Sequence, residues 1–156
     1  MYLAAIVLLL LVLPAASVIV EAYVVPGADS LALIGKWFTF WGVGVRLFLA
    51  GASQVFRPQF TTEGILGVKG ESAYVLAREI GFGNLAIGTL GLLSLAFESW
   101  LVPASLAGGL FYGLAAADHV ARKGKTTKEW VALVSDFFLC IVLAVFLTSR
   151  FVTAGQ

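Results

Sequence analysis

The stretch Arg78-Glu79-Ile80-Gly81-Phe82-Gly83-Asn84 places two charges and an amide near the start of an apolar run that extends from Tyr74 to Phe97. The run can cross a bilayer, because about 20 helical residues span the hydrocarbon core. A charge near the middle of a membrane costs roughly 2.5 to 3.5 kcal/mol on insertion scales, so it usually faces a partner, a cavity or a ligand. The stretch therefore predicts a membrane helix bundle in which other helices supply partners for these charges.

The composition of the whole chain also indicates a membrane protein. Of its 156 residues, 60% are hydrophobic and 12% are charged, whereas ordinary soluble domains have about 25% charged residues. The net charge is +1 and the basic residues are dispersed, which excludes nucleic acid as a partner. A single cysteine, Cys140, excludes an intramolecular disulfide, and with one histidine, His119, the chain offers no metal or haem motif.

Five apolar runs predict an all-α fold, an integral membrane bundle of five transmembrane helices that forms one domain over residues 1–156. The predicted helices cover residues 2–25, 31–56, 74–97, 101–120 and 129–150. We interpret the first run as a helix and not as a cleaved signal, because it lacks a basic start and remains apolar past Ser17. The connection over residues 59–70 predicts an interfacial or re-entrant segment or else an ordered surface loop, and both interpretations stay open.

The loop before the last predicted helix sets the expected orientation. It is rich in basic residues: Arg122, Lys123, Lys125 and Lys128. By the positive-inside rule this loop is cytoplasmic, so five crossings place the N-terminus in the cytoplasm and the C-terminus outside. The expected location is the cell (inner) membrane. Thr126-x-x-Glu129 predicts a capping box at the start of the last helix.

Small residues recur along one face of the third and fourth predicted helices. The third carries Ala77, Gly81, Asn84, Gly88 and Gly91. The fourth carries Ser105, Gly109, Gly113 and Ala117. Such stripes let helix backbones approach closely in a membrane, and we expect these two stripes to pack against each other.

Polar residues of four predicted helices fall in the cytoplasmic half, whereas the outer half of each span is nearly all apolar. At 1.5 Å per residue, Arg46 and Asn84 lie about 15 Å from the cytoplasmic helix ends, Asp136 about 10 Å and Glu79 about 7 Å. We expect Arg46 to pair with Asp136 or Glu79, with Asn84 bridging, around a cavity open to the cytoplasm. The candidate ligand-binding or ion-pair residues are Arg46, Gln54, Glu79, Asn84, Asp136 and His119.

These residues also have structural explanations, which the sequence leaves open. Asn84 can form an interhelical hydrogen bond within the glycine stripe. His119 and Asp118 can end the fourth helix at the lipid headgroups, with proton handling as the alternative. Arg46 and Asp136 can form a purely structural ion pair. No residue is assigned as catalytic or as a metal ligand.

One segment resembles a known family. Arg46-Leu47-Phe48-Leu49-Ala50-Gly51-Ala52-Ser53-Gln54 resembles the arginine followed by Ala-Gly-x-x-Lys of DoxX-like small membrane proteins. Gln54 stands in place of the lysine, and five helices are predicted in place of four. The chain as a whole is similar to an uncharacterised family of small multipass membrane proteins. The DoxX resemblance implies a function near quinone chemistry or in a membrane redox assembly.

Three functions fit these observations. The first is a non-catalytic, oligomeric protein whose cavity binds an amphipathic molecule, a quinone or a lipid, or that serves as an accessory subunit of a membrane redox or transport assembly. The second is a small proton-coupled transporter in which Glu79 or Asp136 titrates. The third, a membrane enzyme, ranks lowest because the sequence has no catalytic or nucleotide-binding motif.

Overall fold

The computed structural model describes residues 2–154, and these residues form six helices, some continuous through π-helical or 3-10 turns. The first two are α1-η1-α2 (Tyr2–Val7, Leu8–Val12, Leu13–Val24) and α3-η2-α4 (Ser30–Phe38, Thr39–Val45, Arg46–Phe56). The others are α5 (Pro58–Thr62), α6 (Glu71–Leu93), η3-α7 (Glu98–Trp100, Leu101–Ala121) and α8 (Thr127–Ala154). The prediction of an all-α fold is confirmed.

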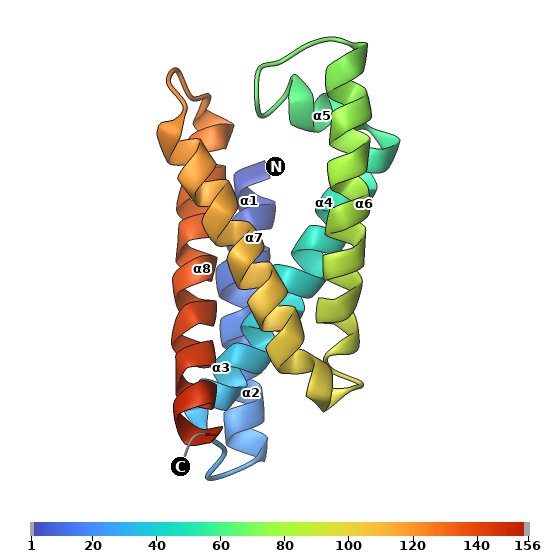
Figure 1. Cartoon of the computed structure of the whole chain (residues 1–156). Helices are drawn as coiled ribbons and strands as arrows, with labels where there is room; N and C mark the ends of the chain where they lie inside the picture. The colour runs from blue at the N-terminus through green and yellow to red at the C-terminus, as the bar shows by residue number, and fades with distance from the viewer. Residues whose placement is uncertain (1, 155–156) are drawn as a thin grey trace.

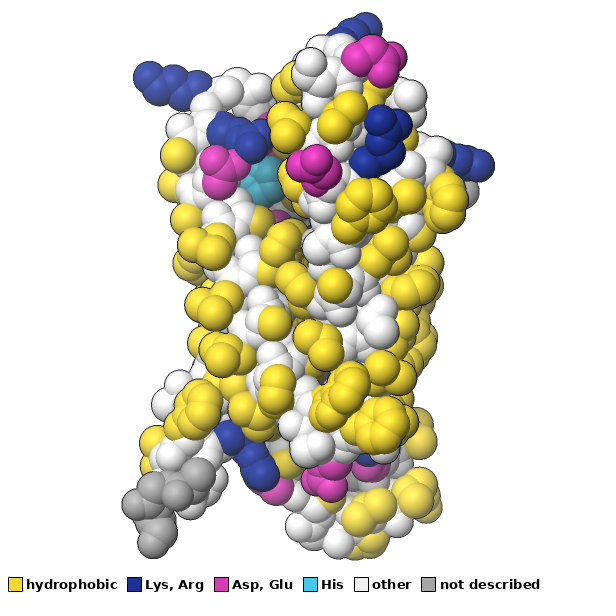
Figure 2. All heavy atoms as spheres, turned by 45° about the vertical axis from the view of Figure 1, so that its right-hand side comes forward, with side chains coloured by type: hydrophobic (Ala, Val, Ile, Leu, Met, Phe, Trp, Pro, Cys, Tyr) yellow, Lys and Arg dark blue, Asp and Glu magenta, His cyan; other side chains and the backbone are white. Residues whose placement is uncertain are grey.

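Four of these helices are long and apolar enough to cross a membrane: Tyr2–Val24, Ser30–Phe56, Glu98–Ala121 and Thr127–Thr153. The remaining long helix, α6, is more polar, since it carries Glu71, Arg78 and Glu79. Figure 2 shows a broad apolar belt around the middle of the molecule, with charged side chains gathered at its two ends. Large exposed apolar side chains are what a helix turns toward lipid, and the chain is therefore a helical membrane protein.

The long helices lie side by side, with α6 along α4 and α7 along α8 (Figure 1). The connection through α5 and the α7–α8 loop lie at the same end of the molecule, and the turn between α2 and α3 lies at the other. A hydrogen bond joins the first two connections, because Thr126 Oγ1 donates to the carbonyl of Ile65 at 2.6 Å. Thr126 also accepts from the backbone N–H of Glu129 at 3.1 Å, so its half of the predicted capping box is present.

Two helices contain a π-helical turn. The first, η1, ends two residues before Pro14, whose missing N–H interrupts the regular hydrogen-bond ladder. The second, η2, directly precedes Arg46, whose N–H donates to the carbonyl of Trp41, five residues back. Within this turn, the Gly42 carbonyl accepts a hydrogen bond from the Tyr112 hydroxyl at 2.6 Å. Such turns occur often at functional sites because they change the face on which the next residues lie.

The expected pairing of the two small-residue stripes is wrong. The stripe on α6 is its buried face, as predicted, but it packs on the second crossing and not on α7. A Cβ on Gly91 would lie 2.5 Å from the backbone nitrogen of Gly44, and one on Gly88 would lie 2.5 Å from that of Phe48. On α7, Gly109 and Gly113 face α8. A stripe predicts a close approach of backbones without naming the partner helix, and Gly44 and Gly51 supply the matching surface for α6.

Candidate ligand site

Arg46 lies at the start of α4, directly after the π-helical turn, and pairs with Asp136 of α8. Its Nη2 donates to Asp136 Oδ1 at 2.7 Å and to Ser135 Oγ at 2.9 Å. Both side chains of the ion pair are largely shielded, with 12% and 8% of their surface exposed. A buried charge pair of this kind is stable only if hydrogen bonds satisfy its remaining polar atoms, so the other nitrogens of the guanidinium matter.

The second terminal nitrogen of Arg46 has no such partner. Nη1 is buried and lacks an acceptor among the described residues. The aromatic ring of Tyr112 covers one face of the guanidinium, whose carbon lies 4.8 Å from the ring centroid. The ring adds cation–π attraction but cannot accept in the guanidinium plane. Arg46 is therefore held on one side by Asp136, Ser135 and Tyr112, and presents an unused donor.

Arg46 lines a pocket of about 750 Å³ between the start of α1, the helix α4 and the α5 connection. The lining side chains are mostly apolar, with polar groups from α1, α4, α5 and α8 among them. They are Tyr2, Ala5, Ile6, Leu9, Arg46, Leu49, Ala50, Ser53, Gln54, Phe60, Thr61, Ile65 and Lys128. A mostly apolar pocket of a few hundred Å³ with a few polar groups is the usual form of a small-molecule site. We call it the Arg46 pocket.

Gln54 and Asn84 connect the Arg46 pocket to the α4–α6 interface. Asn84 Nδ2 donates to Gln54 Oε1 at 2.7 Å, and Asn84 is only 2% exposed. Asn84 therefore forms an interhelical hydrogen bond, one of the two roles that its position in the glycine stripe indicated. The expectation that Asn84 bridges Arg46 and an acid is therefore wrong. Asn84 Oδ1, like Arg46 Nη1, is buried without a partner among the described residues.

Glu79 does not join this group of residues. It is exposed on α6 and has no ion-pair partner among residues 2–154. The expectation that Glu79 is an alternative partner of Arg46 is wrong. Glu79 and Asn84 are five residues apart, which turns them about 140° from each other on a helix; because Asn84 is buried, Glu79 faces outward.

His119 belongs to a separate cluster at the ends of α7 and α8. Its Nδ1 lies 3.1 Å from Oε1 of the buried Glu129. Arg122 pairs with exposed Asp118 at 2.6 Å and approaches Glu129 at 3.8 Å. Asp118 thus lies at the surface as expected for a helix end, whereas His119 turns inward to a carboxylate.

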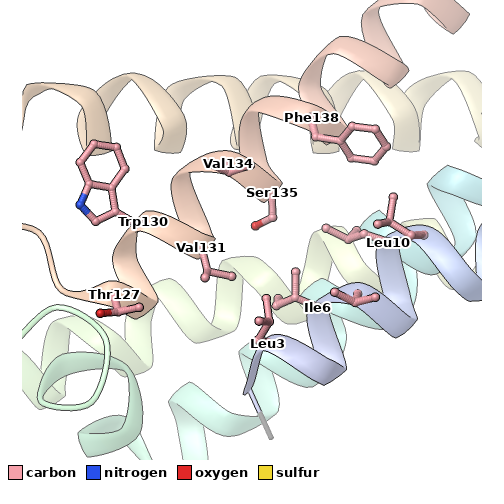
Figure 3. Close-up of a pocket in the computed structure, with 11 residues that line it drawn as sticks. Leu3, Ile6, Leu10, Thr127, Trp130, Val131, Val134, Ser135 and Phe138 are labelled. Atoms are coloured by element: carbon pink, nitrogen blue, oxygen red, sulfur yellow. The ribbon is translucent and has the colours of Figure 1, made fainter.

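A second groove, of about 490 Å³, lies on the other side of α1 (Figure 3). Side chains of α1 and α8 face each other across it, and its lining is apolar apart from Thr127, Ser135 and Trp130. Ile6 lines both this groove and the Arg46 pocket, so the first turns of α1 separate the two. Ser135 connects them chemically, since it lines the groove while accepting a hydrogen bond from Arg46.

Two sets of residues near these sites had not been predicted. Ser135, Tyr112 and Lys128 belong to the surroundings of Arg46, and only Ser135, next to Asp136, carried a signal. The prediction of a nearly all-apolar half is wrong for the half of the bundle at the α2–α3 turn, because Glu21 pairs there with Lys36 at 2.6 Å. Trp37 Nε1 donates to the same carboxylate at 2.6 Å. Glu21 and Lys36 lie within two helical turns of the α2–α3 connection, and their opposite charges at this short separation could have revealed their pairing.

The fold and this site define a class: a small, all-α membrane protein whose helices enclose a buried arginine–aspartate pair next to a pocket. The chain belongs to the family described as Family of unknown function (DUF6790), which it matches over residues 1–153. Comparison with curated proteins and with solved structures gives no match. The predicted membership of an uncharacterised membrane-protein family is thus supported, and the family match provides no link to DoxX-like proteins.

Proposed function

We propose that the chain crosses the membrane five times, with α6 as the third crossing, and that the α5 connection and the α7–α8 loop are cytoplasmic. The hydrogen bond between Thr126 and Ile65 supports this topology, because four crossings without α6 would put these two connections on opposite sides of the bilayer. At about 1.5 Å per residue, the length of α6 also suffices for a crossing. Basic residues concentrate at this end: Arg57, Lys69, Arg122, Lys123, Lys125 and Lys128.

Cysteine labelling tests this topology. In a Cys140→Ala background, we expect a membrane-impermeant maleimide to label Asp29→Cys on intact cells and to label Lys123→Cys only after lysis. Five crossings put these positions on opposite sides, whereas four crossings without α6 put them on the same side. Labelling of both variants on intact cells would therefore contradict the proposal. Labelling of both after lysis is the control for expression and reactivity.

We propose further that the protein binds an amphipathic small molecule in the Arg46 pocket. The observation that carries this proposal is that Arg46, whose buried Nη1 has no partner among the described residues, lines a pocket of about 750 Å³. A buried donor without an acceptor costs about 1 to 3 kcal/mol, and a ligand oxygen at this position would remove that cost. The apolar lining suits a hydrocarbon segment, so the same pocket can accept both parts of an amphipathic molecule.

The proton-coupled transporter has less support. It was based on Glu79 and Asp136, but Glu79 is exposed on α6 and Asp136 is paired with Arg46. The exposed apolar surface could contact another subunit, but contact with lipid explains this surface equally well. It therefore does not favour the role of an accessory subunit. The quinone as ligand depends on the DoxX resemblance alone. Ligand binding at Arg46 is therefore the function that we prefer.

A pair of neighbouring alanines on α1 offers a direct test of the Arg46 pocket. Ala5 and Ala4 are both exposed, but Ala5 lines the Arg46 pocket and Ala4 lines neither it nor the groove between α1 and α8. We expect Ala5→Phe to abolish or reduce at least about tenfold the amount of copurified small molecule, because the ring fills the pocket. Ala4→Phe is expected to retain it. Native mass spectrometry of protein extracted in mild detergent measures the bound mass, and equal occupancy in both variants would contradict the proposal.

A further inference from the structure

The charges around the Arg46 pocket are all of one sign. Among its described lining residues only Arg46 and Lys128 carry a charge, and none is acidic. Asp136 neutralises Arg46 from the side of α8, outside this lining. Lys128 has no ion-pair partner in the described part of the chain and instead lies over the ring of Phe60, 5.4 Å from its centroid. The pocket therefore keeps one uncompensated positive charge.

The neutral polar groups of the pocket can all donate hydrogen bonds. Tyr2, Ser53 and Thr61 contribute hydroxyl groups to its lining. The amide of Gln54 has its oxygen occupied by Asn84, which leaves its NH₂ group available as a donor. Arg46 also lines the pocket, and its buried Nη1 has no partner among the described residues. A ligand group in contact with these side chains meets donors from several elements and no carboxylate.

The pocket also has an apolar side. Ala5 and Ile6 lie on the first helix with Leu9 one turn further along, and Leu49 and Ala50 lie on α4 one turn after Arg46. Tyr2 and Lys128 both approach Phe60, with 6.3 Å between the rings of Tyr2 and Phe60. These contacts bring the start of α1, the α5 connection and the start of α8 together around the pocket.

We infer that the ligand of the Arg46 pocket is an anionic amphiphile, a carboxylate or phosphate group on one apolar chain, and not a neutral quinone. This inference rests on the proposed binding at Arg46 and names its ligand class. The anionic oxygens accept from Arg46 Nη1 and from the neutral donors, while Lys128 supplies the opposite charge. Charge-assisted hydrogen bonds of this kind are about twice as strong as neutral ones, whereas a quinone leaves Lys128 uncompensated.

The test compares ligands that share one chain and differ in the polar group. Purified full-length protein in a neutral detergent is titrated with oleate, oleyl phosphate and oleyl alcohol, and with a short-chain ubiquinone and inorganic phosphate, by native mass spectrometry. We expect at least one of the two anionic amphiphiles to bind about tenfold more tightly than oleyl alcohol and the ubiquinone. The comparison of oleate with oleyl phosphate distinguishes a fatty acid from a phosphate headgroup as the source. Equally tight binding of inorganic phosphate would overturn the assignment of an amphiphile.

Two charge variants complete the experiment. Lys128→Gln is expected to weaken binding of the anionic amphiphile about three- to tenfold and to reduce its salt dependence, with no effect on oleyl alcohol. Lys123→Gln removes the same charge from the adjoining α7–α8 loop, at a residue that does not line the Arg46 pocket, and this variant is expected to bind as the wild type does. The inference is overturned if Lys128→Gln binds the anionic amphiphile as tightly as the wild type does, or if the wild type binds the neutral ligands more tightly than the anionic ones. The proposed pocket still stands in either case, provided that Ala5→Phe weakens binding. If Ala5→Phe instead binds every ligand as the wild type does, the proposed function itself is contradicted.

Discussion

The Asp136→Leu variant is expected to lose about 3 to 5 kcal/mol of unfolding free energy, the range found when one partner of a buried ion pair is removed. The substitution leaves Arg46 without its counter-ion, in a position where only 12% of its side chain is exposed. A guanidinium cannot lose its proton in a protein, so the charge stays. Tyr112 alone cannot replace Asp136, because a cation–π contact is worth about 2 kcal/mol even when desolvated.

Two further variants make this prediction specific to the pair. Arg46→Met is expected to cost less than Asp136→Leu, because the remaining carboxyl group can take up a proton and become neutral. The double variant Arg46→Met/Asp136→Leu is expected to be more stable than either single variant, since two apolar side chains can replace a buried pair at little cost.

The measurement is a denaturant titration of each variant in mixed micelles, followed by circular dichroism. The double-mutant cycle isolates the coupling between the two residues. An exposed ion pair is typically worth less than about 1 kcal/mol. If Asp136→Leu cost no more than that, or if the two single effects were strictly additive, Arg46 would be neutralised by something other than Asp136.

The Gly91→Val variant is expected to lose about 3 kcal/mol or more, at the upper end of overpacking effects. A Cβ on Gly91 would lie 2.5 Å from the backbone nitrogen of Gly44 and 2.6 Å from its Cα. These are backbone atoms, so no side-chain rotation can relieve the clash, and α6 must move away from the second crossing. The same denaturant titration measures the loss.

Gly83 provides the matched control on the same helix. A Cβ at Gly83 meets no atom within 4 Å, so Gly83→Ala is expected to change the stability by less than about 1 kcal/mol, in the stabilising direction, because alanine has the higher helix propensity. If Gly83→Ala and Gly91→Val had the same effect, the close packing of α6 on the second crossing would not be the cause.

Several features of this molecule could be predicted from residue patterns. The apolar runs predicted the five long helices, and four of these are long and apolar enough to cross a membrane. Arg46 required a carboxylate at a similar depth, and Asp136 met that requirement. The buried face of α6 followed from its small residues, since Ala77, Gly81, Asn84, Gly88 and Gly91 are its buried positions.

Other features depended on which helices are neighbours. Glu79 and Asp136 were equal candidates by depth, and only the rotation of α6 on the second crossing turned Glu79 outward. The contact of the π-helical turn before Arg46 with α7 is another such feature, because the Tyr112 hydroxyl that donates to Gly42 lies 70 residues away in the chain. Lys128 appeared as a topology signal in a basic loop, yet the position of α8 beside the α5 connection brings it to the Arg46 pocket.

The sequence by itself determined that the chain is an all-helical membrane protein and that its buried charges need partners, because hydrocarbon cannot solvate a charge or an open backbone. The tertiary structure decided which partners meet, which stripe packs on which helix, and that Arg46 keeps an unused donor next to a pocket. The physical reason is that the requirement for burial acts on each helix separately, whereas pairing depends on the rotation and neighbours of every helix at once.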